Sequence, residues 1–262
     1  MKKMSNYWGE RIAKSQKKLT DKSLKQIEAQ LAKYYSTTMK RTIEDFENTY
    51  LKLLETAGEG KEPTPADLYK LDKYWKLQGQ LKIELEKLGK KQLAALSNIF
   101  ETNFFEIYYS YAAEGVEAFS TLDKQAAQQL INAIWCADGK SWSARVWENT
   151  EKLAATLNEE LIACVASGKK TTELKKALMQ RFDVSYNNAD MLARTELAHV
   201  QTQAAQQRYK DYGIEQVEVF VDEDERTCEI CAAHEGERYN VNAQMPVPFH
   251  PRCRCCMIPV VE

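Results

Sequence analysis

The pattern of apolar and polar positions predicts a protein built mainly from long α-helices. Residues 1–56 are rich in Leu, Ala, Lys, Glu and Gln, contain no proline, and include only one glycine, Gly9. Residues of this kind favour helix over strand, and nothing in the segment gives a strong stop signal. We therefore expect one or two long helices before residue 57.

A loop and a new helix start follow. Residues 57–63 contain two glycines and a proline, which indicate a break. Thr64 can then cap a helix, with Pro65 at its first position and Asp67 as the acidic partner of a capping box. Leucines recur at helical spacing beyond this point, and an aromatic block over residues 100–111 has the same spacing. We interpret that block as core or as a helix–helix interface.

The next hundred residues predict four shorter helices, each opened by a polar residue or closed by glycine. A last helix ends before Gly213. The four predicted helices are Leu122–Cys136, one opened by Ser141 or Ser143, Thr171–Phe182, and one from Ser185 to about Tyr212.

After Gly213 the apolar period changes from helical to alternating. Val217, Val219 and Val221 alternate with other residues, which predicts a strand. Two more short strands are expected at residues 238–241 and 257–261. The predicted fold class is therefore mainly α, with long helices in about the N-terminal two-thirds and a small C-terminal α+β module.

We expect three regions along the chain. They are a helical arm or assembly region over residues 1–133, a helical core over residues 134–213, and a small β module with a metal site over residues 214–262.

Composition restricts the classes of function. Apolar residues make up 44% of the 262-residue chain, enough for a globular core, and no apolar run approaches the roughly 20 residues that a membrane span needs.

The net charge of −2 is not the basic charge typical of a nucleic-acid-binding protein. The first forty residues are locally basic, so they are the candidate DNA contact; the alternative is a solvated helix face. The lysines of this candidate contact are Lys14, Lys17, Lys18, Lys22 and Lys25.

The strongest chemical signal is in the last 35 residues. Five of the seven cysteines lie there, and they form C-x2-C, a spacer of 18 residues, and then H-x2-C-x-C. Cysteine and histidine at this spacing are typical of a tetrahedral structural zinc site. Cys228, Cys231 and His250 are the expected ligands, with either Cys253 or Cys255 as the fourth. A disulfide-bonded tail is the alternative to a metal site.

The same residues resemble the motif of the phage Mu F-like minor head proteins, the head-morphogenesis family of tailed phages. The resemblance covers about half of the chain, from Trp135 onward, and includes a further match over residues 138–147. The motif residues besides the metal ligands are, in the tail, Asp224, Arg226, Thr227, Gly236, Pro251 and Arg254 and, in the preceding helix, Arg194, Thr195 and Glu196.

The resemblance implies a structural protein rather than an enzyme. Such a protein would reside in the procapsid and the virion interior after synthesis in the bacterial host cytoplasm. Its expected partners are the portal protein and the scaffold or major capsid protein, with double-stranded DNA as a further candidate and no membrane. The implied roles are head assembly, DNA packaging and DNA delivery.

Two alternatives come from other classes. His234 lies between the metal-ligand pairs and loosely resembles the catalytic histidine of HNH nucleases, which are metal-dependent; otherwise it is a surface residue. A zinc-ribbon regulator that binds DNA or protein is the second alternative.

Glu196 needs a partner, because helical spacing places its carboxylate among the apolar residues of its helix. We expect it to pair with Arg226, Arg252 or Arg254 of the tail; a catalytic carboxylate is the other interpretation.

Overall fold

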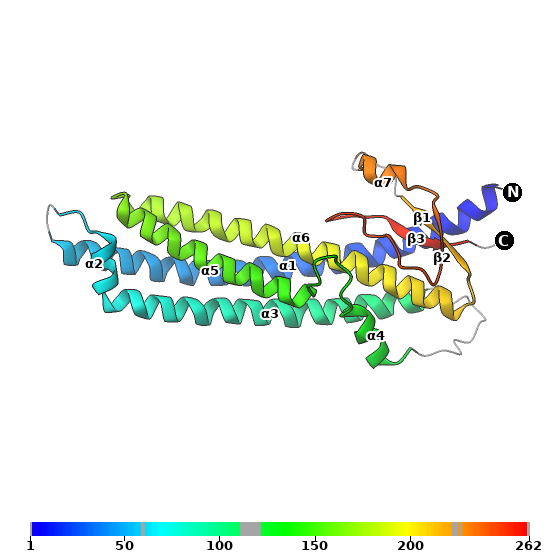
Figure 1. Cartoon of the computed structure of the whole chain (residues 1–262), viewed down its shortest axis with the longest axis horizontal. Helices are drawn as coiled ribbons and strands as arrows, with labels where there is room; N and C mark the ends of the chain where they lie inside the picture. The colour runs from blue at the N-terminus through cyan, green and yellow to red at the C-terminus, as the bar shows by residue number, and fades with distance from the viewer. Residues whose placement is uncertain (1, 59–60, 111–121, 222–224, 226, 261–262) are drawn as a thin grey trace. The chain divides into compact units, whose positions relative to one another are not determined.

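The computed structural model describes residues 2–58, 61–110, 122–221, 225 and 227–260, with side chains of the first helix described from Gly9 onward. The fold is mainly helical, as predicted (Figure 1). The helices are α1 (Lys2–Ala57), α2 (Pro65–Lys70), α3 (Asp72–Ser110), α4 (Lys124–Ile131), α5 (Trp142–Ala166), α6 (Thr171–Asp211) and α7 (Glu229–Ala233). The strands are β1 (Gln216–Phe220), β2 (Arg238–Asn240) and β3 (Cys256–Pro259). None of the described helices combines the length and the apolar character required to cross a bilayer.

The start of α2 confirms the predicted capping box. The Thr64 hydroxyl accepts a hydrogen bond from the backbone N–H of Asp67, and the Asp67 carboxylate accepts one from the backbone N–H of Thr64. Pro65 occupies the first turn. Leu71 then leaves the helical conformation, so α2 ends after six residues and α3 begins separately at Asp72.

The prediction of two helices over residues 171–212 is wrong, because α6 is continuous from Thr171 to Asp211. Ser185 is buried in the middle of α6 and does not cap its start. Its hydroxyl lies 3.1 Å from the hydroxyl of Tyr35, and its carbonyl accepts a hydrogen bond from Asn149 at 2.8 Å. The serine therefore forms part of a polar cluster within the helices, and the residues before it contain no glycine or proline to end the helix.

The chain divides into two compact units that do not follow its linear order. One unit comprises Met1–Glu28, Leu96–Trp142 and Met191–Glu262, and the other Ala29–Ala95 and Ser143–Asp190. The three long helices α1, α3 and α6 contribute to both units. The predicted three-part division along the sequence stays a prediction.

The three strands form one antiparallel sheet in the order β2-β1-β3. The strand prediction is confirmed at all three places. The sheet lies beside the C-terminal part of α6 (Figure 1), where Tyr209 donates a hydrogen bond to the carbonyl of Met257 at 3.1 Å. Gln206 of α6 donates to the carbonyls of Val241 and Ala243 at 2.7 and 2.9 Å. These contacts hold the small sheet and its loops on the long helix.

Candidate metal centre

The first ligand pair is formed at the start of a short helix. Cys228 is the N-cap of α7, and its sulfur accepts a hydrogen bond from the backbone N–H of Cys231 at 3.4 Å. One helical turn separates the two residues, so both thiols lie on the same side. This local geometry explains why the C-x2-C spacing brings two sulfurs together.

The second ligand pair is formed by a tight turn. The backbone N–H of Cys253 donates to the carbonyl of His250 at 3.1 Å, Pro251 is the second residue of the turn, and Arg252 has a φ of 63°. Proline at the second position and a positive φ at the third are the features of a type II turn. The turn is tied to α6 because the backbone N–H of Arg252 donates to the Thr195 hydroxyl at 3.1 Å.

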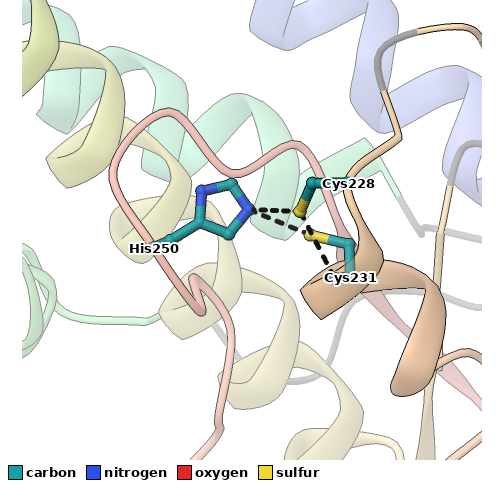
Figure 2. A group of neighbouring side chains, drawn as sticks. All are labelled: Cys228, Cys231 and His250. Carbon is teal, nitrogen blue, oxygen red and sulfur yellow. Dashed lines mark hydrogen bonds between the residues drawn. The ribbon is translucent and has the colours of Figure 1, made fainter.

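The His250 ring presents its Nε2 edge to the thiols (Figure 2). Nε2 lies 3.2 Å from the sulfur of Cys228 and 3.1 Å from that of Cys231. The other ring nitrogen, Nδ1, donates to the carbonyl of Pro251 at 2.8 Å, because a carbonyl can only accept. Histidine metal ligands commonly donate their second N–H to a carbonyl in this way, which leaves the first nitrogen free to bind the ion.

Two groups of potential ligand atoms share the sulfur of Cys231. In the described residues, one group contains Cys228, Cys231 and His250 and the other contains Cys231, Cys253 and Cys255, with the atoms of each within 4.8 Å of one another. The sulfurs of Cys231 and Cys253 are 3.8 Å apart. Two sulfurs bound to one tetrahedral zinc at about 2.3 Å would also be about 3.8 Å apart. The cluster can therefore hold a metal ion.

The two sulfur–nitrogen distances are shorter than in a metal-bound site. A zinc ion would hold a sulfur and an imidazole nitrogen about 3.6 Å apart. The observed 3.1 and 3.2 Å correspond to hydrogen-bond contacts between the two sulfurs and the His250 ring nitrogen.

The thiols differ in how readily they lose a proton. A hydrogen bond from Cys255 lowers the pKa of Cys253 to about 5, and the same interaction raises the pKa of Cys255. Burial raises the pKa of Cys231 to about 12, whereas the backbone N–H of Cys231 lowers the pKa of Cys228. A bound cation would favour the thiolate form of each ligand, so metal binding would release protons.

The motif residues Arg194, Thr195 and Glu196 lie on α6 where the His250–Cys253 turn is hydrogen-bonded to that helix. Thr195 accepts the hydrogen bond from Arg252 and donates its own hydroxyl to the carbonyl of Met191 at 2.7 Å. Glu196 is buried, and its carboxylate accepts a hydrogen bond from the indole N–H of Trp135 at 2.9 Å. Arg194 forms a 3.8 Å ion pair with Glu28. The expected pairing of Glu196 with an arginine of the tail stays a prediction.

The remaining predicted site residues are not among the two groups of ligand atoms, although Thr227 and Arg254 lie beside them. Gly236 lies in a turn and has a φ of 77°, Thr227 is half-buried, and Pro251 and Arg254 are exposed. Asp224 and Arg226 lie outside the described residues. The five lysines proposed as a DNA contact are exposed, and one of them, Lys22, pairs with Glu106.

His234 lies outside both groups of ligand atoms. Its Nδ1 is 2.7 Å from the carboxylate of Glu237, and its ring stacks on Phe249 with ring centroids 4.3 Å apart. The metal-ligand groups of the described residues do not include it.

Sequence reasoning missed His199. The residue is buried on α6, one turn after Glu196, and stacks on Trp135. Its position three residues after Glu196 on an apolar helix face was the available signal, because residues at this spacing lie side by side.

The long helix, the small antiparallel sheet and the Cys/His cluster define a small module with a candidate metal site on a helical scaffold. Residues 155–258, which include all of α6 and most of this module, match the family described as phage Mu protein F like protein. This match covers less than half of the chain, and it confirms the predicted resemblance from residue 155 onward. The predicted match over residues 138–147 lies outside it and stays a prediction. Comparison with curated proteins and with solved structures gave no match.

Proposed function

We propose that this protein is a structural minor component of a tailed-phage head and acts in head morphogenesis. The family match over residues 155–258 carries the proposal. It is supported by the coincidence of that match with α6 and the metal-ligand cluster, since the matched segment is the one in which the sequence motifs meet in space.

Within this role, the long helices are the proposed assembly surface for the portal protein, the scaffold or the major capsid protein. α1, α3 and α6 each exceed thirty residues in length. Several large apolar side chains are exposed on them, including Trp75 and Ile83 on α3 and Val184 on α6. Exposed apolar side chains on helices are what a partner helix or a capsid protein surface would bury.

The metal is proposed to be zinc in a structural role. Thiolates and an imidazole in this pattern suit zinc, and a cluster that can supply four protein ligands leaves no position open for substrate. The three short strands offer little apolar area of their own, so the ion would contribute to folding on the order of 10 kcal/mol. Its place at the junction of α7, the turn and β3 would fix the module on α6.

Deletion of the gene from the phage genome tests the head role. We expect lysates that contain tails but lack normal DNA-filled heads by electron microscopy, with rescue by the wild-type gene supplied in trans. The Cys228→Ser variant should rescue poorly, whereas the exposed-surface variant Lys82→Gln should rescue fully. Normal numbers of filled, infectious heads after deletion would contradict the proposal.

DNA delivery or packaging would bring the chain close to the genome. The five lysines on α1 follow the spacing i, i+3, i+4, i+8 and i+11, which places them on one side of the helix. We expect salt-dependent binding of duplex DNA that weakens when all five are changed to Gln. Five exposed lysines elsewhere, changed to Gln together, are the matched control: Lys70, Lys76, Lys82, Lys87 and Lys90. Equal affinity of the two variants for duplex DNA would show that the α1 lysines do not bind it. The proposed role in the phage head would not be affected.

A further inference from the structure

The candidate ligands come from two segments that are separate along the chain. Cys231 belongs to α7, with Cys228 as its N-cap, whereas His250 lies in the loop that follows β2. Nε2 of His250 is nevertheless 3.1 Å from the sulfur of Cys231. Thiols are weak hydrogen-bond donors and acceptors, so this contact alone would hold the two segments together only weakly. A further attachment between α7 and the loop would keep the ligands in place.

His234 and Phe249 form an attachment of this kind. Their rings are parallel to within 9°, and the ring centroids are 4.3 Å apart. His234 is the C-cap residue of α7, three residues after Cys231, and Phe249 directly precedes His250. The stacked pair therefore joins two residues that each lie within one helical turn's length of a candidate ligand, one on each segment.

The orientation of the His234 ring is fixed by a hydrogen bond from another direction. Its Nδ1 donates to the carboxylate of Glu237 at 2.7 Å, since a carboxylate can only accept. The same carboxylate accepts a hydrogen bond from the hydroxyl of Tyr239 at 2.7 Å. Tyr239 belongs to β2 and pairs with Val217 of β1. The sheet therefore positions Glu237, and Glu237 orients the ring that stacks on Phe249.

We propose that His234 is a positioning residue of the candidate metal centre, and that its ring holds α7 against the loop that carries His250. This inference rests on the proposed zinc site. The ring itself is not a ligand, because neither group of ligand atoms in the described part of the chain includes it. Residues that orient metal ligands without binding the ion change metal affinity by about 10- to 100-fold when they are replaced. The role of His234 then requires no catalytic step.

Four variants and one control test the stack. His234→Ala removes the ring, whereas His234→Phe keeps an aromatic ring that can stack on Phe249. Phe249→Ala removes the other half of the pair, and the double variant with alanine at both positions completes a double-mutant cycle. Arg238→Gln is the matched control, because Arg238 is an exposed residue of the same sheet and pairs with Glu218.

The first measurement is the zinc affinity of the full chain by competition with a chelator. We expect His234→Ala and Phe249→Ala each to weaken zinc affinity about tenfold, and the double variant to be within about twofold of either, because each single change already removes the stack. His234→Phe and Arg238→Gln should stay within about threefold of wild type. Independent structural damage at the two positions would instead add in the double variant.

The second measurement needs no metal. Alkylation of the reduced, metal-free chain is followed at each cysteine by mass spectrometry. Cys231 and Cys253 are buried, so we expect their alkylation to become several-fold faster in His234→Ala, in which the loop is no longer held on α7. Cys164 is the internal reference, because it is buried on α5 and belongs to the other compact unit.

The outcomes separate this inference from the zinc site on which it rests. Equal zinc affinity of His234→Ala and wild type would overturn the proposal, and so would additive losses in the double-mutant cycle. Faster alkylation of Cys164 in the same variant would also overturn it, because the protein would then be unfolding as a whole. Wild-type protein that binds no zinc would reject the metal centre, and the alkylation rates alone would then decide whether His234 holds the two segments together.

Discussion

The indole ring of Trp135 lies flat on the imidazole ring of His199, with centroids 4.6 Å apart and ring planes inclined by 11°. The same indole donates its N–H to Glu196 at 2.9 Å. Trp135 follows α4, and the other two residues lie one turn apart on α6. His199 is buried, with an exposed fraction of 5%. This burial lowers the pKa of His199 to about 4.

Acid should therefore destabilise the protein through His199. In the unfolded chain the histidine has a pKa of about 6.5, so between pH 6.5 and pH 4 the unfolded state takes up a proton that the folded state does not. The contribution is present in full above pH 6.5 and is lost as the pH falls toward 4, with a total of about 3 kcal/mol. Urea unfolding across this range measures it.

His199→Phe is the control variant, because an aromatic ring can still stack on Trp135 but cannot take up a proton. We expect a shallower loss of unfolding free energy on acidification than in wild type. The side chains of the metal-ligand cluster titrate in both proteins, so their contribution to the pH dependence of the unfolding free energy cancels when the two proteins are compared. Identical slopes in the two proteins would show that His199 does not titrate as its burial indicates.

Replacement of two glycines of α3 by alanine should change the stability of the protein in opposite directions. At Gly79 an added Cβ meets no heavy atom within 4 Å, so Gly79→Ala should raise stability by up to about 1 kcal/mol through helix propensity. At Gly89 an added Cβ would lie 2.5 Å from Cζ3 of Trp147, so Gly89→Ala should lower stability by about 1–3 kcal/mol. Melting temperatures of the two variants test this, and a stabilising Gly89→Ala would mean that the Trp147 ring can move away.

The helices and strands could be predicted because their signals are local. The capping box at Thr64 and Asp67 and the alternation through Val217 and Val219 each depend on residues close in the sequence. The false boundary at Ser185 has the same origin, since a serine before an apolar stretch indicates a helix start when its surroundings are unknown. In the fold its polar atoms contact Tyr35 and Asn149, which are far away in the sequence.

The sequence predicted which residues form the candidate metal site, but not the contacts that attach the site to α6. The spacing identified Cys228, Cys231 and His250, which the fold brings together. The hydrogen bond between Thr195 and the backbone of Arg252 joins residues 57 apart, and a side-chain-to-backbone contact leaves no signature in the residue types. The stack of Trp135 on His199 depends in the same way on the path of the chain between α4 and α6.

Removal of the Thr195 hydroxyl should loosen the metal-binding turn. Thr195→Val keeps the shape of the side chain but leaves the backbone N–H of Arg252 without this acceptor, which should lower the unfolding free energy by about 1 kcal/mol. Zinc transfer to a chromogenic chelator should also become faster, because His250 and Cys253 belong to the same turn. Thr195→Ser retains the hydroxyl and is the control. Equal transfer rates in all three proteins would show that the turn is held by its other contacts.

Cys253 and Cys255 should differ as metal ligands. The sulfur of Cys253 is at the tetrahedral distance from that of Cys231, and Cys253 closes the His250 turn, so we expect it to be the fourth ligand. Cys255 would then act through its hydrogen bond to Cys253, and Cys255→Ser should weaken zinc affinity by about 10- to 100-fold. Cys253→Ser, like Cys228→Ser, should weaken it further and lower the melting temperature. Zinc content and chelator competition measure both effects. The reverse order would make Cys255 the ligand, and wild-type protein purified without zinc and unable to bind it would rule out the metal centre.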